Sequence, residues 1–302
     1  MRVVKPVTIT DAVLTSSSIP EPDSGETEWT PGTYTLGARV IKSSTHRTYQ
    51  AVVDPSTTTD PEVGVVTDPP SWVDVGATNR WAMFDTVNSS ASETTAQLVV
   101  TLTPGQIVNS VAGFSIEQVT DANVTVTDPI EGIVYNQDLP FSDDSAVSDW
   151  YQYYFSPIVR AAEFILLDLP AYPNAVLTIT FNGNNIKVGS FVIGSQLDIG
   201  IANFGTSVQL LDFSRKETDA FGNVVITPGR TSKLVNYDVT IDRSKVSYVF
   251  NTLSKLTSIP CVWVGTDDLN DETLVFGYYR DFQNNVSSPT ITDATLTIEG
   301  LV

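Results

Sequence analysis

Short apolar runs constrain the fold of this chain more than any other feature of its sequence. They are rich in Val, Ile, Thr and Tyr, and Gly, Pro, Asn and Asp bound them. Successive side chains of a strand point to opposite faces, so runs of this length and composition predict β-strands. The predicted strands are 7–14, 38–42, 49–53, 97–102, 123–127, 175–181, 208–213, 224–227, 234–241, 261–265, 274–279 and 294–301. This spacing is typical of an all-β sandwich or barrel.

One segment has helical spacing instead. Its apolar residues recur every three or four positions, on one face of a helix: Val246, Val249, Phe250, Leu253 and Leu256. Ile259-Pro260 ends the pattern, because the residue before a proline avoids the helical conformation. We expect the principal helix of the C-terminal region near 244–258. Its apolar face should be buried against the strands 261–265, 274–279 and 294–301.

The composition excludes several classes of protein. The chain has 35 Asp and Glu against 16 Lys and Arg, a net charge of −19, which disfavours binding to phosphate backbones. One Cys and one His in 302 residues exclude an internal disulfide, cysteine-rich metal sites and two-histidine metal centres. No apolar run is long enough to span a membrane. We therefore expect no nucleic-acid partner, no metal, no cofactor and no membrane insertion.

The charges are unevenly distributed. No Lys or Arg occurs from 81 to 159, where ten Asp and Glu lie, whereas 215–255 contains seven Lys and Arg and four Asp and Glu. Regions of opposite sign can meet within one protomer or between protomers. The alternative is a solvated acidic surface, because net charge mainly determines solubility.

Signatures of catalysis are missing from the sequence. It has no GxSxG, no phosphate-binding glycine loop, and a single histidine, His46, which we expect in an exposed turn. Two carboxylates suffice for a glycosidase, and Asp143-Asp144 and Asp267-Asp268 are candidates by residue type only. The acidic segment 267–272 suits Ca²⁺ as well as a polar turn, and the turn is favoured because the EF-hand spacing is absent. We expect no enzymatic activity.

Segments rich in Pro, Gly, Ser and Thr, at 16–32, 54–71 and 87–95, suggest domain boundaries. They predict an N-terminal arm (1–28), a small β module (29–76), a β-sandwich (77–190) and a β-rich C-terminal region with one helix (191–302). Because its flanks are polar and linker-like, we expect the module to project as a separately folded unit.

The module carries a pattern of aromatic residues. Trp29 is followed by Tyr34, Gly37 and Val40, then by Tyr49-Gln-Ala and by Trp72. This pattern resembles the small chitin-binding-type carbohydrate modules. The resemblance implies that Trp29, Tyr34, Tyr49 and Trp72 form a flat platform on which sugar rings stack. The alternative is that these rings form the core of a module used for structure or docking.

The segment 77–190 is similar in layout to galactose-binding-like jelly rolls, since an Asn/Trp/Asp stretch at 79–85 precedes alternating strands. The similarity implies a jelly-roll-like sandwich, with Trp81, Phe84 and Phe164 in its core. Five aromatic residues then crowd into six positions: Trp150, Tyr151, Tyr153, Tyr154 and Phe155. A short helix or loop cannot bury them all, so we expect an exposed cluster and a protein interface.

The C-terminal half resembles tail proteins of tailed bacteriophages. The segments that carry the resemblance are 211–222, 260–265, 276–282 and 296–301. It implies a structural part of the virion tail, at the tail tip, baseplate or fibre. The expected partners are other tail proteins, further copies of the chain and, as an option, a host surface glycan. The alternatives are a carbohydrate-binding surface or secreted protein and, third, a glycan-cleaving enzyme.

Overall fold

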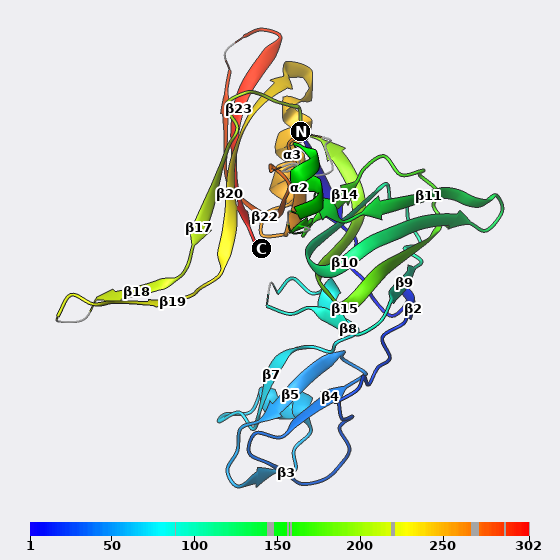
Figure 1. Cartoon of the computed structure of the whole chain (residues 1–302), viewed down its shortest axis with the longest axis vertical. Helices are drawn as coiled ribbons and strands as arrows, with labels where there is room; N and C mark the ends of the chain where they lie inside the picture. The colour runs from blue at the N-terminus through cyan, green and yellow to red at the C-terminus, as the bar shows by residue number, and fades with distance from the viewer. Residues whose placement is uncertain are drawn as a thin grey trace.

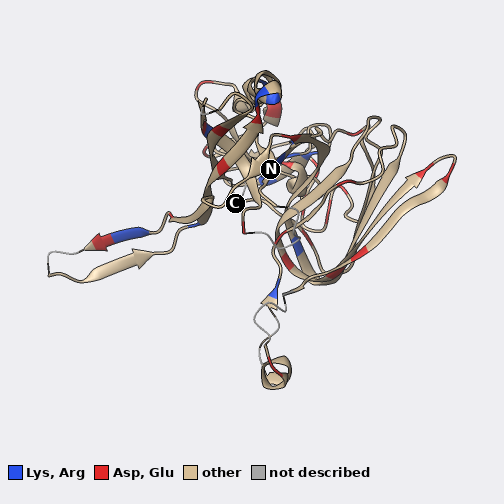
Figure 2. Cartoon of the chain, turned by 90° about the horizontal axis from the view of Figure 1, so that it is seen from above, with Lys and Arg blue, Asp and Glu red and all other residues tan. Residues whose placement is uncertain are grey.

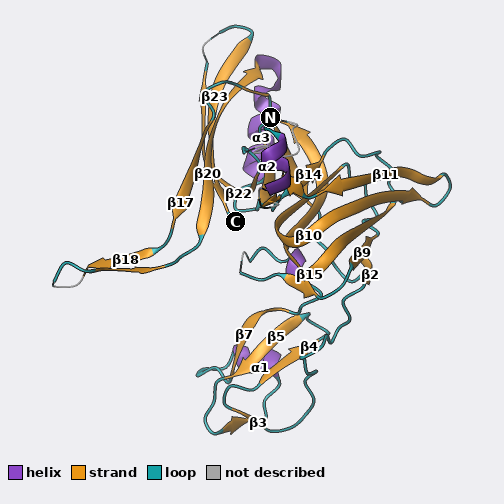
Figure 3. Cartoon of the chain, in the orientation of Figure 1, coloured by secondary structure: helices purple, strands orange, loops and turns teal. Residues whose placement is uncertain are grey.

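Antiparallel strand pairing organises most of the molecule. The structure is a computed structural model that describes residues 1–87, 89–143, 148–155, 157, 159–218, 221–266, 272–286 and 288–301. Strands dominate these residues, and fourteen of them form one continuous hydrogen-bonded sheet that folds into a β-sandwich-like body (Figures 1 and 3). The mainly β class predicted from the sequence is confirmed.

Two long strands, β10 (Ser110–Asp128) and β15 (Val176–Asp198), pair along most of their length and form the first half of the body. The strands around them are β2 (Leu14–Ser17), β8 (Ser92–Thr94), β9 (Leu98–Leu102), β11 (Gly132–Pro140) and β14 (Phe164–Leu166). Alternate residues of β9 are buried, as are those of 177–181 in β15. They meet Trp81 and Phe164 in one core, which agrees with the core positions expected for both rings.

The first strand joins this half to the second. β1 (Arg2–Pro6) pairs with β15 on one side and with β21 (Cys261–Val264) on the other. The sheet then continues through β22 (Val275–Asn285), β23 (Ile291–Gly300) and β20 (Thr231–Asp242) to β16 (Ile201–Ala202) and β17 (Ser207–Asp212). Residues 1–28 are therefore not a separate arm, because Val3 and Val4 are fully buried between neighbouring strands.

Two further boundaries differ from the prediction. β15 runs through residue 190, so the sandwich does not end there. The predicted strand 7–14 is instead a turn-containing segment that leads into β2 at Leu14. Both differences arise because β1 and β15 pair with strands that lie far away in the sequence. A local pattern of residues does not indicate such distant partners.

The predicted helix is present as α3 (Val246–Lys255), preceded by the 3₁₀ turn η2 (Arg243–Lys245). Val249, Leu253 and Leu256 are buried in a core with residues of the three expected strands, among them Trp263, Val275 and Leu296. The expectation fails for Phe250, which is 62% exposed and touches only the rim of the core, with its ring 6.5 Å from that of Phe282. Fewer residues of α3 are therefore buried than the apolar pattern of its sequence predicts.

The module is a small β unit with its own core. Its sheet contains β4 (Arg39–Lys42), β5 (Arg47–Ala51) and β7 (Trp72–Ala77), and it also includes β3 (Tyr34–Thr35), β6 (Ser56–Thr57) and the short helix α1 (Pro61–Val65). It lies below the two halves of the body (Figure 1). That it serves an external surface stays a prediction.

One remaining element, η1 (Ala82–Phe84), buries Met83 in the first core. The others lie at the periphery: they are β12 (Ser142–Asp143) paired with β13 (Val159–Arg160), α2 (Trp150–Phe155), and β18 (Arg215–Thr218) paired with β19 (Val224–Thr227). Among the described residues, no helix has the length and apolar character needed to cross a membrane.

Two substitutions on α3 test its packing. Leu253→Ala should lower the free energy of unfolding by about 2–5 kcal/mol, because it leaves a cavity under the helix. Phe250→Ala should cost about 1 kcal/mol or less, because its ring is mostly in water. Urea unfolding followed by circular dichroism measures both, and equal losses would contradict the burial described for this helix.

Candidate functional site

The four module aromatics do not share one surface. Tyr49 and Trp72 lie in the module core, with 5% and 0% of their surface exposed. The indole Nε1 of Trp72 donates to the carbonyl oxygen of Thr59 at 2.8 Å, which satisfies the one polar atom of the buried side chain. The expectation of a four-ring platform is therefore wrong for these two residues, because a 48-residue module needs its largest rings to fill its core.

Trp29 and Tyr34 are half-buried at the edge of this core. The ring of Tyr34 packs edge-on against Trp72 at 5.4 Å, and its hydroxyl donates to the carbonyl oxygen of Thr30 at 2.8 Å. The Nζ of Lys42 lies 5.4 Å from the centre of the Trp29 ring. These contacts give both rings a structural role, and sugar binding by the parts that remain exposed stays a prediction.

The junction between module and body is held by a buried carboxylate. The side chain of Glu21 is 6% exposed. Its oxygens accept hydrogen bonds from Thr78 Oγ1 at 2.6 Å and from Trp81 Nε1 at 3.0 Å, and they face His46 Nδ1 at 2.9 Å. The carboxylate thereby connects the turn before β5, the residues after β7, and the N-terminal segment.

His46 is part of this junction rather than an exposed turn residue. It does lie in a turn, at φ 55°, but its ring stacks on Trp81 with 4.0 Å between the ring centres. Its Nε2 lies 3.0 Å from Asp11 Oδ1, so both ring nitrogens face carboxylates. The one histidine of the chain therefore has a structural use.

The aromatic cluster on α2 is entirely exposed. Trp150, Tyr151, Tyr153, Tyr154 and Phe155 have 65–77% of their surface in solvent, and the helix contains no buried residue. Among the described residues, these rings form aromatic contacts with one another: Trp150 stacks with Tyr154 at 6.3 Å, and Tyr151 lies 4.8 Å from Phe155. The expectation that a short helix leaves aromatic rings exposed is confirmed.

Local hydrogen bonds hold α2 in the helical conformation. Asp149 caps it, since its Oδ1 accepts from the backbone nitrogen of Gln152 at 2.7 Å. Gln152 reaches back and accepts from the backbone nitrogen of Ser148 at 2.7 Å. A helix of six residues is marginal in water, so these caps preserve a shape that displays the five rings.

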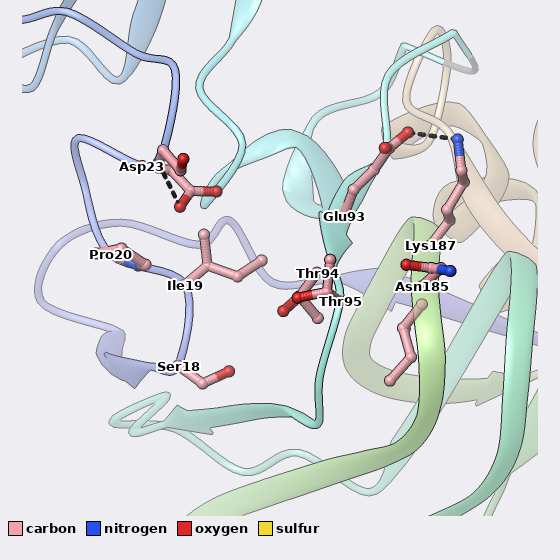
Figure 4. Close-up of a pocket in the computed structure, with 11 residues that line it drawn as sticks. Ser18, Ile19, Pro20, Asp23, Glu93, Thr94, Thr95, Asn185 and Lys187 are labelled. Atoms are coloured by element: carbon pink, nitrogen blue, oxygen red, sulfur yellow. Dashed lines mark hydrogen bonds and ion pairs between the residues drawn. The ribbon is translucent and has the colours of Figure 1, made fainter.

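A polar pocket of about 260 Å³ lies between residues 18–24 and the strands β8 and β15 (Figure 4). Its charged groups are already engaged: Glu93 pairs with Lys187 at 2.7 Å, and Asp23 accepts from the backbone nitrogen of Ser24 at 2.6 Å. The described side chains that line it include no nucleophile beside a base. The pocket therefore offers hydrogen bonds but no arrangement for acid–base or nucleophilic chemistry.

The side chains of the two acidic doublets lie outside the part of the chain that the structure describes. Asp144 and Asp267-Asp268 lie outside the described residues, as does the side chain of Asp143. Within the described part of the chain, no three His, Cys, Asp or Glu side chains gather as metal ligands. Cys261 is buried, and this burial raises the pKa of its thiol to about 12, so the residue is an unreactive part of the core.

Two features were not predicted from the sequence. Glu21 lies in a segment expected to be a linker, and nothing in its neighbourhood indicates three distant hydrogen-bonding partners. The exposed hairpin of β18 and β19 contains the predicted strand 224–227, but the pairing of that strand with 215–218 was not predicted. The consecutive charged residues Arg215, Lys216 and Glu217 of β18 were the available signal for an unburied position.

Removal of the junction carboxylate should loosen the module. Glu21→Ala leaves Trp81 Nε1 and Thr78 Oγ1 without their acceptor and should cost about 3 kcal/mol of stability. Small-angle X-ray scattering should also show a wider spread of module positions. Glu117→Ala, which removes an exposed carboxylate, is the matched control. A Glu21→Ala protein with unchanged stability and scattering would contradict this role.

Comparison with known proteins assigns no family. No protein-family model matches the chain, and a search of curated proteins finds no match.

Proposed function

We propose that this chain is a structural component of a tailed-bacteriophage virion, located at the tail tip, baseplate or fibre, where it assembles with other tail proteins and with further copies of itself. One observation carries the assembly part of the proposal. Five aromatic side chains of α2 are held in water by a capped six-residue helix.

Exposure of these rings to water is unfavourable in free energy. Each ring transferred from water into an interface gains about 25 cal/mol per Å² of apolar area. Tyr and Trp are also enriched at interface centres, because they bury a large area with few rotatable bonds. A contiguous aromatic surface on a monomer marks an interaction site. The cluster therefore supports docking of another protein.

The resemblance of the C-terminal half to phage tail proteins is the basis for proposing the virion tail as the place of assembly. It agrees with a β-rich, acidic chain that has a single cysteine, buried in its core. The alternative of a carbohydrate-binding protein has less support, since Tyr49 and Trp72 are buried. The third alternative, a glycan-cleaving enzyme, has no positive support, since the side chains of the two candidate acidic doublets lie outside the described residues.

Polar substitution on α2 tests the proposal. In Trp150→Ser with Tyr154→Ser, the loss of central aromatic contacts should raise the dissociation constant of the assembly by about 30-fold, which corresponds to roughly 2 kcal/mol. Sedimentation of the purified protein and incorporation into phage particles measure this effect. Both residues are exposed, so the melting temperature should not change.

Tyr248→Ser is the matched control, because it replaces a half-exposed aromatic residue on α3. The proposal predicts normal assembly for this variant. A wild-type protein that stays monomeric at every concentration and is missing from phage particles would overturn the proposal. Retardation of that monomer by polysaccharide gels, lost in Trp29→Ala, would favour the carbohydrate-binding alternative.

A further inference from the structure

The hairpin of β18 and β19 stands away from the rest of the molecule. All eight residues of its two strands are exposed, and among the described residues no third strand pairs with it. Figures 1 and 2 show it extending outward from the end of β17 and β20. We call these two strands the arm.

Both faces of the arm carry apolar side chains. Val224, Val225 and Ile226 are each 59% exposed, and successive residues of a strand point to opposite faces. The register places Lys216 opposite Ile226 and Glu217 opposite Val225, so each face combines a charge with a β-branched residue. A two-stranded hairpin is marginally stable alone, and its unpaired edges attract further strands. This construction suits a segment that another chain covers.

The opposite end of the large sheet offers a complementary edge. β11 is the terminal strand there, and in the described part of the chain it pairs only with β10. Ile130 and Ile133, at and after the β10–β11 turn, are 93% and 67% exposed. β11 therefore presents an unpaired edge beside exposed apolar side chains, which are the features used when a strand is added to a sheet.

The charges of the two ends are also complementary. The β10–β11 hairpin lies in the segment 81–159, which has no Lys or Arg, and it carries Asp121, Asp128, Glu131 and Asp138. Figure 2 shows red without blue along this hairpin, and blue followed by red on β18 at the other end. The two strands of the arm carry the cations Arg215 and Lys216 against one carboxylate, Glu217.

The cations of the arm can exchange their present ion-pair partners for others. Arg215 pairs with Glu217, and Lys216 lies 3.3 Å from Asp212, but all four side chains are 45–75% exposed. Exposed pairs of this kind contribute little, so their cations can change partners at small cost. The acidic hairpin and the arm lie on opposite sides of one chain (Figures 1 and 2), which makes contact between them a contact between two copies.

We propose that the arm of one copy adds to the unpaired edge of β11 in the next copy, with Arg215 and Lys216 against the acidic β10–β11 hairpin. The two surfaces differ, so the contact is head-to-tail and generates a ring or an open filament. This inference deepens the proposed assembly function and rests on it. The occupant of the arm is a second copy of this chain.

Cysteine cross-linking tests the contact directly. Cys261 is buried, and this burial raises the pKa of its thiol to about 12, so we expect the native cysteine not to form cross-links under mild oxidation. Val225→Cys and Ile133→Cys place exposed thiols on the arm and on β11. Mild oxidation of a mixture of the two variants should give a cross-linked dimer, and the chain that carries both changes should give a ladder.

The matched control mixes Val225→Cys with Val66→Cys, which adds a thiol at a residue 81% exposed on the module. Cross-linking of this pair as efficient as that of the first pair would overturn the proposal. A second result would also overturn it: Val225→Cys alone forms a cross-linked dimer, and adding Ile133→Cys does not raise the yield. This result would mean that two arms pair with each other.

Charge reversal supplies a second, independent readout. Arg215→Glu with Lys216→Glu should reduce the cross-linked yield about tenfold, and added salt should reduce the wild-type contact in the same direction. Glu131→Lys with Asp138→Lys in the partner should restore the yield. Unchanged yields across this series would contradict the assigned charge pairing.

The outcomes also separate this inference from the proposed function. If the α2 variant fails to assemble while the arm and β11 never cross-link, assembly stands and the arm proposal is wrong. If the wild-type protein is monomeric and shows no cross-link, both proposals are wrong. A cross-link that persists in the α2 variant supports the arm contact as a separate interface.

Discussion

The antiparallel pairing of β1 with β15 and β21 is the interaction on which the rest of the molecule depends. Five residues at the start of the chain form the strand that lies between the two halves of the large sheet. Gly194 in β15 marks how tightly they fit, because a Cβ atom at that position would collide with the carbonyl oxygen of Lys5. Without this strand, the core around Phe181 and the core around Trp263 would belong to separate sheets.

Local patterns predicted the elements better than their pairing. The spacing of Val249, Leu253 and Leu256 predicted α3, because a helix is determined by contacts three and four residues apart. The same pattern misplaced Phe250, since the width of a buried face depends on the sheet beneath it. Residues 182–185, Asn-Gly-Asn-Asn, have the composition of a hairpin turn, but they lie within β15, where Asn185 has a positive φ and the register with β10 shifts. Turn-forming residues there make an irregularity in a continuing strand.

The candidate surfaces show the same limit. The density of aromatic residues at 150–155 was enough to predict exposure, because no short element can bury five rings. The four aromatic residues of the module were ambiguous, since sugar platforms and small cores use the same side chains, and only the fold shows Tyr49 and Trp72 inside. The roles of Glu21 and His46 depend on contacts with Thr78, Trp81 and Asp11, which no local sequence pattern indicates.

The exposed aromatic helix, the arm and the unpaired edge of β11 give the molecule three surfaces that a monomer leaves unsatisfied. Hydroxyl-radical footprinting of the isolated chain and of the phage particles in which we propose that it assembles tests this account most directly. Trp150, Tyr151, Tyr153, Tyr154 and Phe155 should be oxidised readily in the isolated chain and about tenfold more slowly after assembly, because an interface excludes water. Equal oxidation of these residues in both states would contradict the account.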